Sequence, residues 1–390
     1  MKKIIDTERI PIKLWLDEVD DQTLYQAKNL ANLPFAFKHI ALMPDAHSGY
    51  GMPIGGVMAA DKVIVPNAVG VDIGCGMCAV KTNLRINPDI RKRLKDIVGD
   101  IRERVPVGFK HHKRAQDENL MPEGYEIDNL EVVSSEYESA LRQLGTLGGG
   151  NHFIEIQRDK EDYIWIMIHS GSRNLGKKVA DHYNKLAKKL NKRWNSPVPP
   201  KADLAYLPFT TTEAHMYYYE MNYCVDFALA NRKLMLTRVQ EVFRHYFPNI
   251  IFGEIINIAH NYAAWEKHFG KKVVVHRKGA TSAHKGELGI IPGSQGTSSF
   301  IVEGLGNPES FASCSHGAGR IMGRNEAVRN LSLEYEIDKL DKKGILHSIR
   351  SRRDLDEAPS AYKNIVQVML DQEDLVEIKV KLSPLAVIKG

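Results

Sequence analysis

The stretch Asn67–Cys78 reads N-A-V-G-V-D-I-G-C-G-M-C. Its three glycines interrupt both helix and strand. We therefore expect a backbone that bends after a strand at Val63–Val65 and presents Asp72 and Cys75 on one side. A carboxylate and a thiolate make half of a metal site, and histidines elsewhere in the chain could supply the other half.

The composition is that of a globular protein, with 43% hydrophobic and 26% charged residues among 390. The N-terminus is charged where a signal peptide would be apolar, and no stretch reaches membrane-spanning length. Four cysteines are too few for a disulfide scaffold in so long a chain. These features predict a cytoplasmic protein. The net charge of +5 is compatible with an anionic partner but does not by itself indicate one.

Strand and helix patterns alternate along the whole chain, and no linker or repeat divides it. We therefore predict one large α+β domain over residues 1–390, with mixed sheets flanked by helices. Helices are predicted at Asp20–Ala31, Pro88–Arg104, Ser134–Leu144, Thr212–His245, Leu331–Lys343 and Pro359–Leu370, with Ser134 as the cap of the third. A lysine-rich helix is predicted after Arg173, ending at about Arg193. Another is predicted to open at Cys314–Arg320 and to end at about Asn330. Strands are predicted at His39–Met43, Met52–Ala60, Val63–Val65, Met77–Lys81, Tyr163–Ile168, Ile250–Ile258, Lys272–His276, Phe300–Val302 and Leu375–Ile388.

Three histidines fall next to predicted strands or glycines. His152 follows a triple glycine, and His169 and His260 end apolar strands. Any one of them alone is better explained as a hydrogen-bonded core or surface histidine. Together with Asp72 and Cys75 they make a five-ligand set, which exceeds what one tetrahedral ion needs, and a thiolate can bridge two ions. Two neighbouring ions suit phosphoryl chemistry.

The pair Cys75 and Cys78 also matches a redox or zinc half-motif. No second C-x-x-C follows, which argues against a four-cysteine zinc site. A thioredoxin-like pair normally opens a helix, whereas this pair leads into a predicted strand. Redox chemistry stays open as a less favoured alternative, and we expect Cys78 to serve packing.

The segment Ser313–Arg320 reads S-C-S-H-G-A-G-R. Small residues on both sides let other groups approach His316, and the following helix would offer amide donors to a phosphate. An imidazole there can attack phosphorus and form a phosphoramidate, with Arg320 steadying the charge. The alternative is a helix-capping histidine in a tight turn.

Other segments give weaker signals. The loop Gly293–Gly296 could cradle a phosphate or sugar, although serine and glycine also make ordinary turns. No Walker motif and no dinucleotide-binding glycine fingerprint occurs. Basic runs, each of which is usually a solvated face, could contact an RNA backbone. They lie at Lys110–Arg114, Lys177–Lys189, Arg277–Lys278 and Arg350–Arg353.

Taken in order, these motifs resemble the signature of the RtcB family of RNA-splicing ligases over nearly the whole chain. The matching segments are Met43–His47, Gly70–Gly76, Gly148–Phe153, His169–Arg173, His260–Asn261, Ile291–Ser294 and Ser315–Arg320. The resemblance implies a GTP- and Mn²⁺-dependent ligase. It would join an RNA 3′-phosphate or 2′,3′-cyclic phosphate end to a 5′-hydroxyl end, in RNA repair or tRNA splicing.

The same resemblance implies roles for individual residues. Asp72, Cys75, His152, His169 and His260 would hold two Mn²⁺ ions, with Cys75 as the bridge, and His316 would take GMP from GTP. The family positions around the guanylate are matched by Asn151, Glu155, Ser294, Ser299, His316, Ala318, Gly319, Tyr362 and Lys389. An archease-type activator is a conceivable partner, and the motifs do not select the physiological RNA.

Two other hypotheses compete with the ligase. One is a metal-dependent phosphoesterase that opens RNA cyclic phosphates without sealing. The other is a non-catalytic protein that binds RNA or metal. The presence of both His316 and Lys389 favours the ligase, because neither alternative needs a nucleotidyl-accepting histidine.

Overall fold

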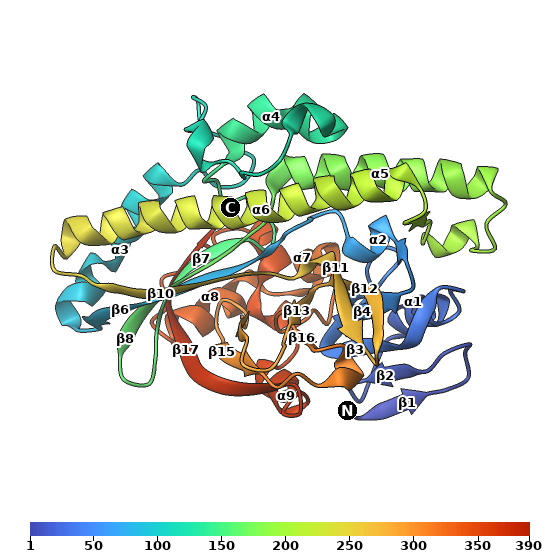
Figure 1. The fold of residues 1–390 in the computed structure, drawn as a ribbon. Helices are drawn as coiled ribbons and strands as arrows, with labels where there is room; N and C mark the ends of the chain where they lie inside the picture. The colour runs from blue at the N-terminus through green and yellow to red at the C-terminus, as the bar shows by residue number, and fades with distance from the viewer.

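The structure is a computed structural model that describes residues 1–390. Two large sheets, one mixed and one wholly antiparallel, form its centre, and helices cover them (Figure 1). The predicted mixed α/β fold class is therefore confirmed. None of the helices combines the length and the apolar character that a membrane crossing needs.

The first large sheet has six strands, and all neighbours pair antiparallel except β2 and β3. In spatial order they are β1 (Lys3–Ile5), β2 (Ile12–Leu14), β3 (Ala36–His47), β4 (Ile54–Ala60), β12 (Lys271–Lys278) and β11 (Asn261–His268). The second sheet has seven antiparallel strands: β10 (Phe252–Ala259), β6 (Gly76–Arg85), β8 (Tyr163–Ser170), β7 (Phe153–Arg158), β17 (Val376–Lys389), β15 (Ser299–Gly304) and β14 (Leu288–Ile291). Two small pairs are β13 (Ala280–Ser282) with β16 (Ser313–Ser315), and β5 (Val63–Ile64) with β9 (Leu207–Pro208).

The helices are α1 (Asp21–Ala31), α2 (Pro66–Val69), α3 (Pro88–Arg104), α4 (Glu131–Gln143), α5 (Arg173–Arg193), α6 (Thr212–Tyr246), α7 (Arg324–Asn330), α8 (Leu333–Asp341) and α9 (Ile365–Leu370). Figure 1 shows α5 and α6 lying across one side of the sheets, with α4 outside them. Helix α6 packs on β6, β8 and β10, which are central and edge strands of the seven-stranded sheet. Its buried face carries aromatic and aliphatic side chains such as Phe227, Met235 and Phe243.

The two large sheets meet at a single chain position. Strand β10 belongs to the seven-stranded sheet and β11 to the six-stranded one, and only His260 separates them. Strand β6 begins beside this point, because Gly76 pairs with Ala259 on one side and Ser170 on the other. The junction of the two sheets therefore lies where the predicted metal residues leave their strands.

The structure differs from several predicted elements. Helix α4 starts three residues before Ser134, because the buried Glu220 carboxylate accepts hydrogen bonds from the amides of Val132 (3.0 Å) and Val133 (2.8 Å). This tertiary cap replaces the predicted serine cap. Strand β3 runs on to His47, beyond the predicted end. Strand β11 was missed, and the predicted helix Pro359–Leu370 is a 3₁₀ turn followed by the short α9.

The predicted helix after His316 ends at Asn330 as expected, but its predicted start is wrong. Ser313–Ser315 form strand β16, and the next helix, α7, begins only at Arg324. The amides of His316 and Gly317 donate to Asp45 Oδ2 at 3.0 and 3.2 Å. No helix N-terminus therefore faces a ligand at His316.

Candidate active site

The turn around Asp72 is held by residues from distant elements. After the short α2, Gly70 and Gly74 adopt φ angles of 98° and 74°, which other residues rarely reach. The fully buried Arg232 on α6 donates to the carbonyls of Gly74 (2.9 Å) and Ser170 (2.8 Å). Asn261 donates to the Asp72 carbonyl at 3.0 Å. These bonds fix Cys75 at the junction of the sheets.

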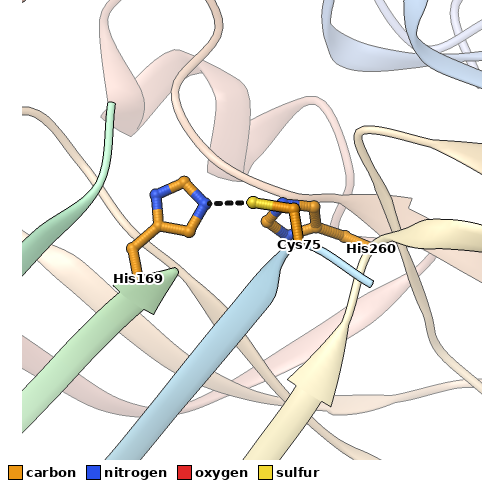
Figure 2. Close-up of side chains that lie close together, drawn as sticks. All are labelled: Cys75, His169 and His260. Carbon is orange, nitrogen blue, oxygen red and sulfur yellow. Dashed lines mark hydrogen bonds between the residues drawn. The ribbon is translucent and has the colours of Figure 1, made fainter. Parts of the chain in front are cut away.

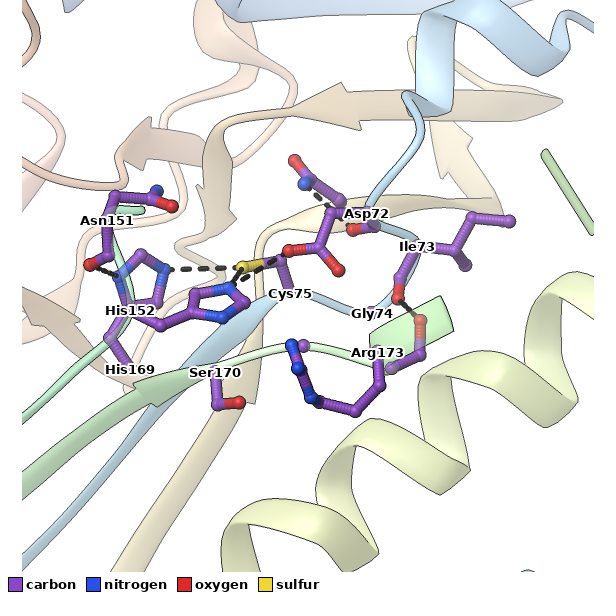
Figure 3. A network of polar contacts seen from close by, with 12 residues as sticks. Asp72, Ile73, Gly74, Cys75, Asn151, His152, His169, Ser170 and Arg173 are labelled. Carbon is purple, nitrogen blue, oxygen red and sulfur yellow. Dashed lines mark hydrogen bonds and ion pairs between the residues drawn. The ribbon is translucent and has the colours of Figure 1, made fainter. Parts of the chain in front are cut away.

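The five predicted metal ligands come together around the Cys75 sulfur. Cys75 Sγ lies 3.4 Å from His152 Nε2 and 3.3 Å from His169 Nε2. His152 Nε2 lies 3.1 Å from Asp72 Oδ2. Figure 2 shows His169 and His260 on either side of Cys75, and Figure 3 shows Asp72 and His152 on its other flank. The ligand atoms make two groups, Cys75 with His169 and His260, and Cys75 with Asp72 and His152.

These residues fit a pair of metal ions by their chemistry. Burial, with the neighbouring histidines, lowers the pKa values of His169 and His260 well below their usual range, so both rings are neutral and can donate lone pairs. His169 Nδ1 bonds the Asn151 carbonyl at 3.1 Å, which aims Nε2 at the sulfur. His260 Nδ1 is buried without a hydrogen-bond partner. Only Cys75 belongs to both groups, as a bridging thiolate would.

His316 lies next to this cluster, with its ring centre 4.8 Å from that of His260. Its Nδ1 is 2.6 Å from Oδ2 of Asp45, which is completely buried. Burial would raise the pKa of Asp45, but the charge and hydrogen bond of His316 outweigh it and the pKa is lowered. Asp45 is thus ionised and can accept a hydrogen bond from an Nδ1–H group, and Nε2 lies on the opposite side of the ring.

A pocket with a cavity volume of about 160 Å³ opens beside His316. Of the predicted guanylate residues, eight line it: Asn151, Glu155, Ser294, His316, Ala318, Gly319, Tyr362 and Lys389. Ser299 is buried behind the wall, where its Oγ accepts from Gln157 Nε2 (3.1 Å) and from the Gly293 amide (3.2 Å). Ser299 therefore shapes the pocket without lining it.

One buried carboxylate, Glu357, organises the cations of the pocket. It contacts Arg320 Nη1 at 3.3 Å, Arg324 Nε at 2.8 Å and Lys389 Nζ at 3.4 Å, and it accepts from the Tyr362 hydroxyl. Burial opposes its charge, but these cations lower the pKa of Glu357 to about 2. Three cations share one anion, so the pocket wall is electropositive and suits phosphate groups.

Glu155 lies in the same pocket in a different state. Burial raises its pKa to about 8, although Gln157 donates to it and Lys389 attracts its charge. The carboxyl is therefore mostly neutral at pH 7 when no ligand is bound. A ligand with paired hydrogen-bond donors would favour its ionised form.

The structure also adds residues to which the sequence assigned no role. Asp45, Arg232 and Glu357 all support the site from buried positions. Asp45 falls in the matched segment Met43–His47, which was a signal for it. Arg232 sits in a regular helical pattern and Glu357 in a charged run, so neither stood out.

One predicted basic run is structural. Arg277 is completely buried and pairs with Glu266, and the Lys278 ammonium donates to the carbonyls of Tyr50 (2.6 Å) and Asn67 (3.1 Å). Neither side chain can reach a polyanion. Cys78 is fully buried in an apolar cluster and joins neither ligand group, in agreement with a packing role.

A cysteine-centred cluster of candidate metal ligands lies next to a histidine at the edge of a cation-lined pocket, and this arrangement suits a class of protein that carries out phosphoryl chemistry. A sequence model of the family described as tRNA-splicing ligase RtcB matches residues 26–390. The chain is 40% identical to the RNA-splicing ligase RtcB of Escherichia coli K12, over 100% of this chain and 99% of that protein. It is 33% identical to the tRNA-splicing ligase RtcB of Thermococcus kodakarensis, over 98% and 95%.

A eukaryotic relative, the RNA-splicing ligase RtcB homolog 1 of Entamoeba histolytica, is 32% identical over 94% of this chain and 83% of its own. The chain belongs to the RtcB family of RNA-splicing ligases. The resemblance and the prediction of an enzyme of the RNA-ligase class are thereby confirmed.

Proposed function

We propose that this protein is a GTP- and Mn²⁺-dependent ligase that joins RNA 3′-phosphate or 2′,3′-cyclic phosphate ends to 5′-hydroxyl ends through a histidine–GMP intermediate. One observation carries the proposal: His316, with Nδ1 held by Asp45, lies between the Cys75-centred cluster and a cation-lined pocket. Both tRNA splicing, which several of its relatives are named for, and RNA repair would supply such ends.

The first step uses the Nε2 lone pair of His316. It attacks the α-phosphorus of GTP, an N–P bond forms, and the bond to the bridging oxygen breaks so that pyrophosphate leaves. Asp45 keeps the proton on Nδ1 and stabilises the positive charge that develops on the ring. His316 therefore needs no separate base.

The pocket residues would hold the nucleotide for this attack. The Glu155 carboxylate can accept from the N1–H and the amino group of guanine, which places the base against β7. Lys389, Arg320 and Arg324 offer positive charge, and Asn151 and Ser294 offer polar groups. Ala318 and Gly319 leave room next to the nucleophile, and Tyr362 borders the same space.

Asp72, Cys75, His152, His169 and His260 would hold the two Mn²⁺ ions, with Cys75 in both coordination spheres. When bound, the ions supply Lewis-acid stabilisation of charge on phosphate oxygens. The residues themselves keep this corner rigid and water-poor, since Cys75, His152, His169 and His260 are buried.

The remaining steps pass the guanylate to RNA. An oxygen of the RNA 3′-phosphate attacks the phosphorus of His316–GMP, the N–P bond breaks, and an activated RNA end forms. The 5′-hydroxyl of the second RNA then attacks that end, loses its proton, and expels GMP as the 3′,5′ bond forms. A cyclic phosphate must first be opened by water to a 3′-phosphate.

The test is to incubate the protein with α-labelled GTP and Mn²⁺, denature it, and look for acid-labile label. We expect label on the wild type and none on His316→Ala, with His284→Ala, an exposed histidine, as the matched control. The proposal would be contradicted if the wild type carried no label or if His316→Ala were labelled. A product with opened cyclic ends but no joined RNA would assign the chain to the phosphoesterase alternative.

The bridging role of Cys75 gives a separate prediction. Cys75→Ala should bind less manganese and lose guanylylation, because one sulfur serves both ligand groups. Cys78→Ala is the matched control, since Cys78 is equally buried but joins no group. Atomic absorption would measure the manganese bound by each variant. Equal manganese content in Cys75→Ala and Cys78→Ala would contradict the two-ion assignment.

A further inference from the structure

The loop that follows α3 carries an aromatic side chain with no packing partner. Phe109 is 100% exposed, although phenylalanine is normally buried or half-buried. The other exposed apolar side chains of comparable size, such as Tyr50 at 77%, retain some cover. The function described so far makes no use of Phe109 or of the basic run beside it.

The base of this loop is fixed to the active-site backbone. The Gly108 amide donates to the Gly148 carbonyl at 2.8 Å, and the Gly108 carbonyl accepts from Arg173 Nη2 at 3.2 Å. A side chain on Gly148 would collide with Arg173 and lie 2.6 Å from His152 Nδ1. Gly148 thus packs directly on a member of the ligand cluster, and Figure 3 shows Arg173 beside that cluster.

The far side of the loop is anchored as well. The His112 amide donates to the Arg142 carbonyl at 3.0 Å, and the Gln116 amide donates to the Leu141 carbonyl at 3.1 Å. Arg238 on α6 bonds His112 Nε2 at 2.7 Å. The tip of the loop, Phe109–Arg114, is held by these anchors, and its exposed side chains, beginning with Phe109, project from the frame.

The tip is also strongly basic. Lys110, Lys113 and Arg114 are exposed, and none of them makes an ion pair with an acidic side chain. The preceding residue Val107 lines a cleft together with Glu357 and Lys389, which also line the pocket of His316. The aromatic and basic tip therefore stands at the rim of the active site.

We propose that Phe109 stacks on an unpaired base of the RNA strand next to the ends being joined, while Lys110, Lys113 and Arg114 contact the adjacent phosphates. Aromatic side chains bind single-stranded nucleic acid in this way because every base has a π-face, so the contact tolerates any sequence. Lysines and arginines without an acidic partner can contact the phosphates of the RNA backbone. This inference rests on the proposed function, because it takes RNA as the substrate.

The test uses RNA with a 3′-phosphate, in the absence of GTP so that nothing reacts. A fluorescent base, 2-aminopurine, is placed at each of the positions nearest the end. With wild type we expect quenching at one or two of these positions, and with Phe109→Ala we expect that quenching to disappear. Affinity of Phe109→Ala for the RNA should fall between about 5- and 150-fold, the range measured for loss of one stacked base.

Two controls make the result specific. Phe109→Trp should restore quenching and affinity, since it keeps a stacking face. Tyr219→Ala removes another exposed aromatic, 59% exposed on α6, and should leave RNA binding unchanged. An abasic nucleotide at the quenched position should make wild type and Phe109→Ala bind equally. The proposal would be overturned if quenching survived in Phe109→Ala, or if wild type and Phe109→Ala bound the abasic RNA with different affinities.

The basic residues give a second readout. Lys113→Ala with Arg114→Ala should reduce the slope of log affinity against log salt by about 1.4, because each lost contact with a single strand removes about 0.7. An unchanged slope would remove these two residues from the interface. Guanylylation of the wild type is measured on the same preparation without RNA. Its absence would refute the proposed function, whereas normal labelling with unaltered RNA binding by Phe109→Ala would refute the stacking alone.

Discussion

Oδ2 of Asp45 accepts hydrogen bonds from three groups, the His316 ring, the His316 amide and the Gly317 amide. The backbone bonds fix the carboxylate, and the carboxylate fixes the ring. Asp45 is therefore a positioning residue for the proposed nucleophile, His316. Its negative charge also selects the Nδ1–H tautomer, which a neutral amide does less well.

We expect Asp45→Asn to slow guanylylation by about 10² to 10⁴-fold while GTP still binds. The comparison is the rate of label incorporation at saturating GTP, together with the GTP dissociation constant. Lys363→Met tests the electrostatic part alone, since Lys363 bonds the carbonyls of Pro44 and Ala46 and its charge helps to lower the pKa of Asp45, so its effect should be smaller. A large change in GTP affinity with an unchanged rate would contradict the positioning role.

Glu155 predicts a pH dependence of guanylate binding. Its pKa of about 8 in the free pocket means that the neutral form prevails at pH 7, whereas guanine's donors need the carboxylate. Affinity for GMP should therefore rise with pH, by about eightfold between pH 7 and pH 8.5. Isothermal calorimetry on His316→Ala would measure it, and Glu155→Gln should show weak binding without this slope. A flat profile in the parent would contradict the assignment.

At the scale of elements, α6 supports the cluster through Arg232. Arg232→Met would leave the carbonyls of Gly74 and Ser170 and the Asn257 side chain without their buried donor. We expect a loss of about 3 kcal/mol in unfolding free energy and weaker manganese binding. Lys233→Met, an exposed neighbour, should change stability by less than about 0.5 kcal/mol. Urea titration would measure the unfolding free energy of both variants, and metal analysis their manganese content. Equal values for Arg232→Met and Lys233→Met would contradict the supporting role of Arg232.

Elements with a clear local pattern were predicted well from the sequence. Helices Pro88–Arg104 and Thr212–Tyr246 show apolar periodicity and side-chain caps, and they occur nearly as expected. Helix α4 was displaced because its cap comes from Glu220, 88 residues from Val132. The turn after His316 was mistaken for a helix because its amides bond Asp45. Long-range partners of this kind leave no mark in the local pattern.

The same division holds for the site. Histidines at strand ends and the glycine turn of Asp72 could be recognised because chemistry and spacing coincide there. Ser299 could not be separated from the lining residues, since a serine in the wall and one behind it look alike in sequence. Glu357 was missed because its four partners come from Arg320 to Lys389 and converge only in the fold.

At the scale of the whole molecule, we propose that residues 1–390 form one catalytic domain. Strands β10 and β11 join the two large sheets through His260, and the ligand cluster lies at that junction. Buried Trp15 reports on the six-stranded side and Trp165 on the seven-stranded sheet. In each variant that keeps only one of these tryptophans, with phenylalanine at the others, fluorescence and far-UV circular dichroism should give the same urea midpoint. Separate midpoints would divide the chain into two domains.

The hydrogen bond between Asp45 and His316 joins residues 271 positions apart. A contact of such sequence separation closes a very long loop, and its entropic cost must be met before the contact stabilises anything. During refolding, local helices such as α3 can form early, whereas the nucleophile reaches its carboxylate only when most of the chain is in place. We therefore expect the contact between Asp45 and His316 to form late in refolding, after the local helices.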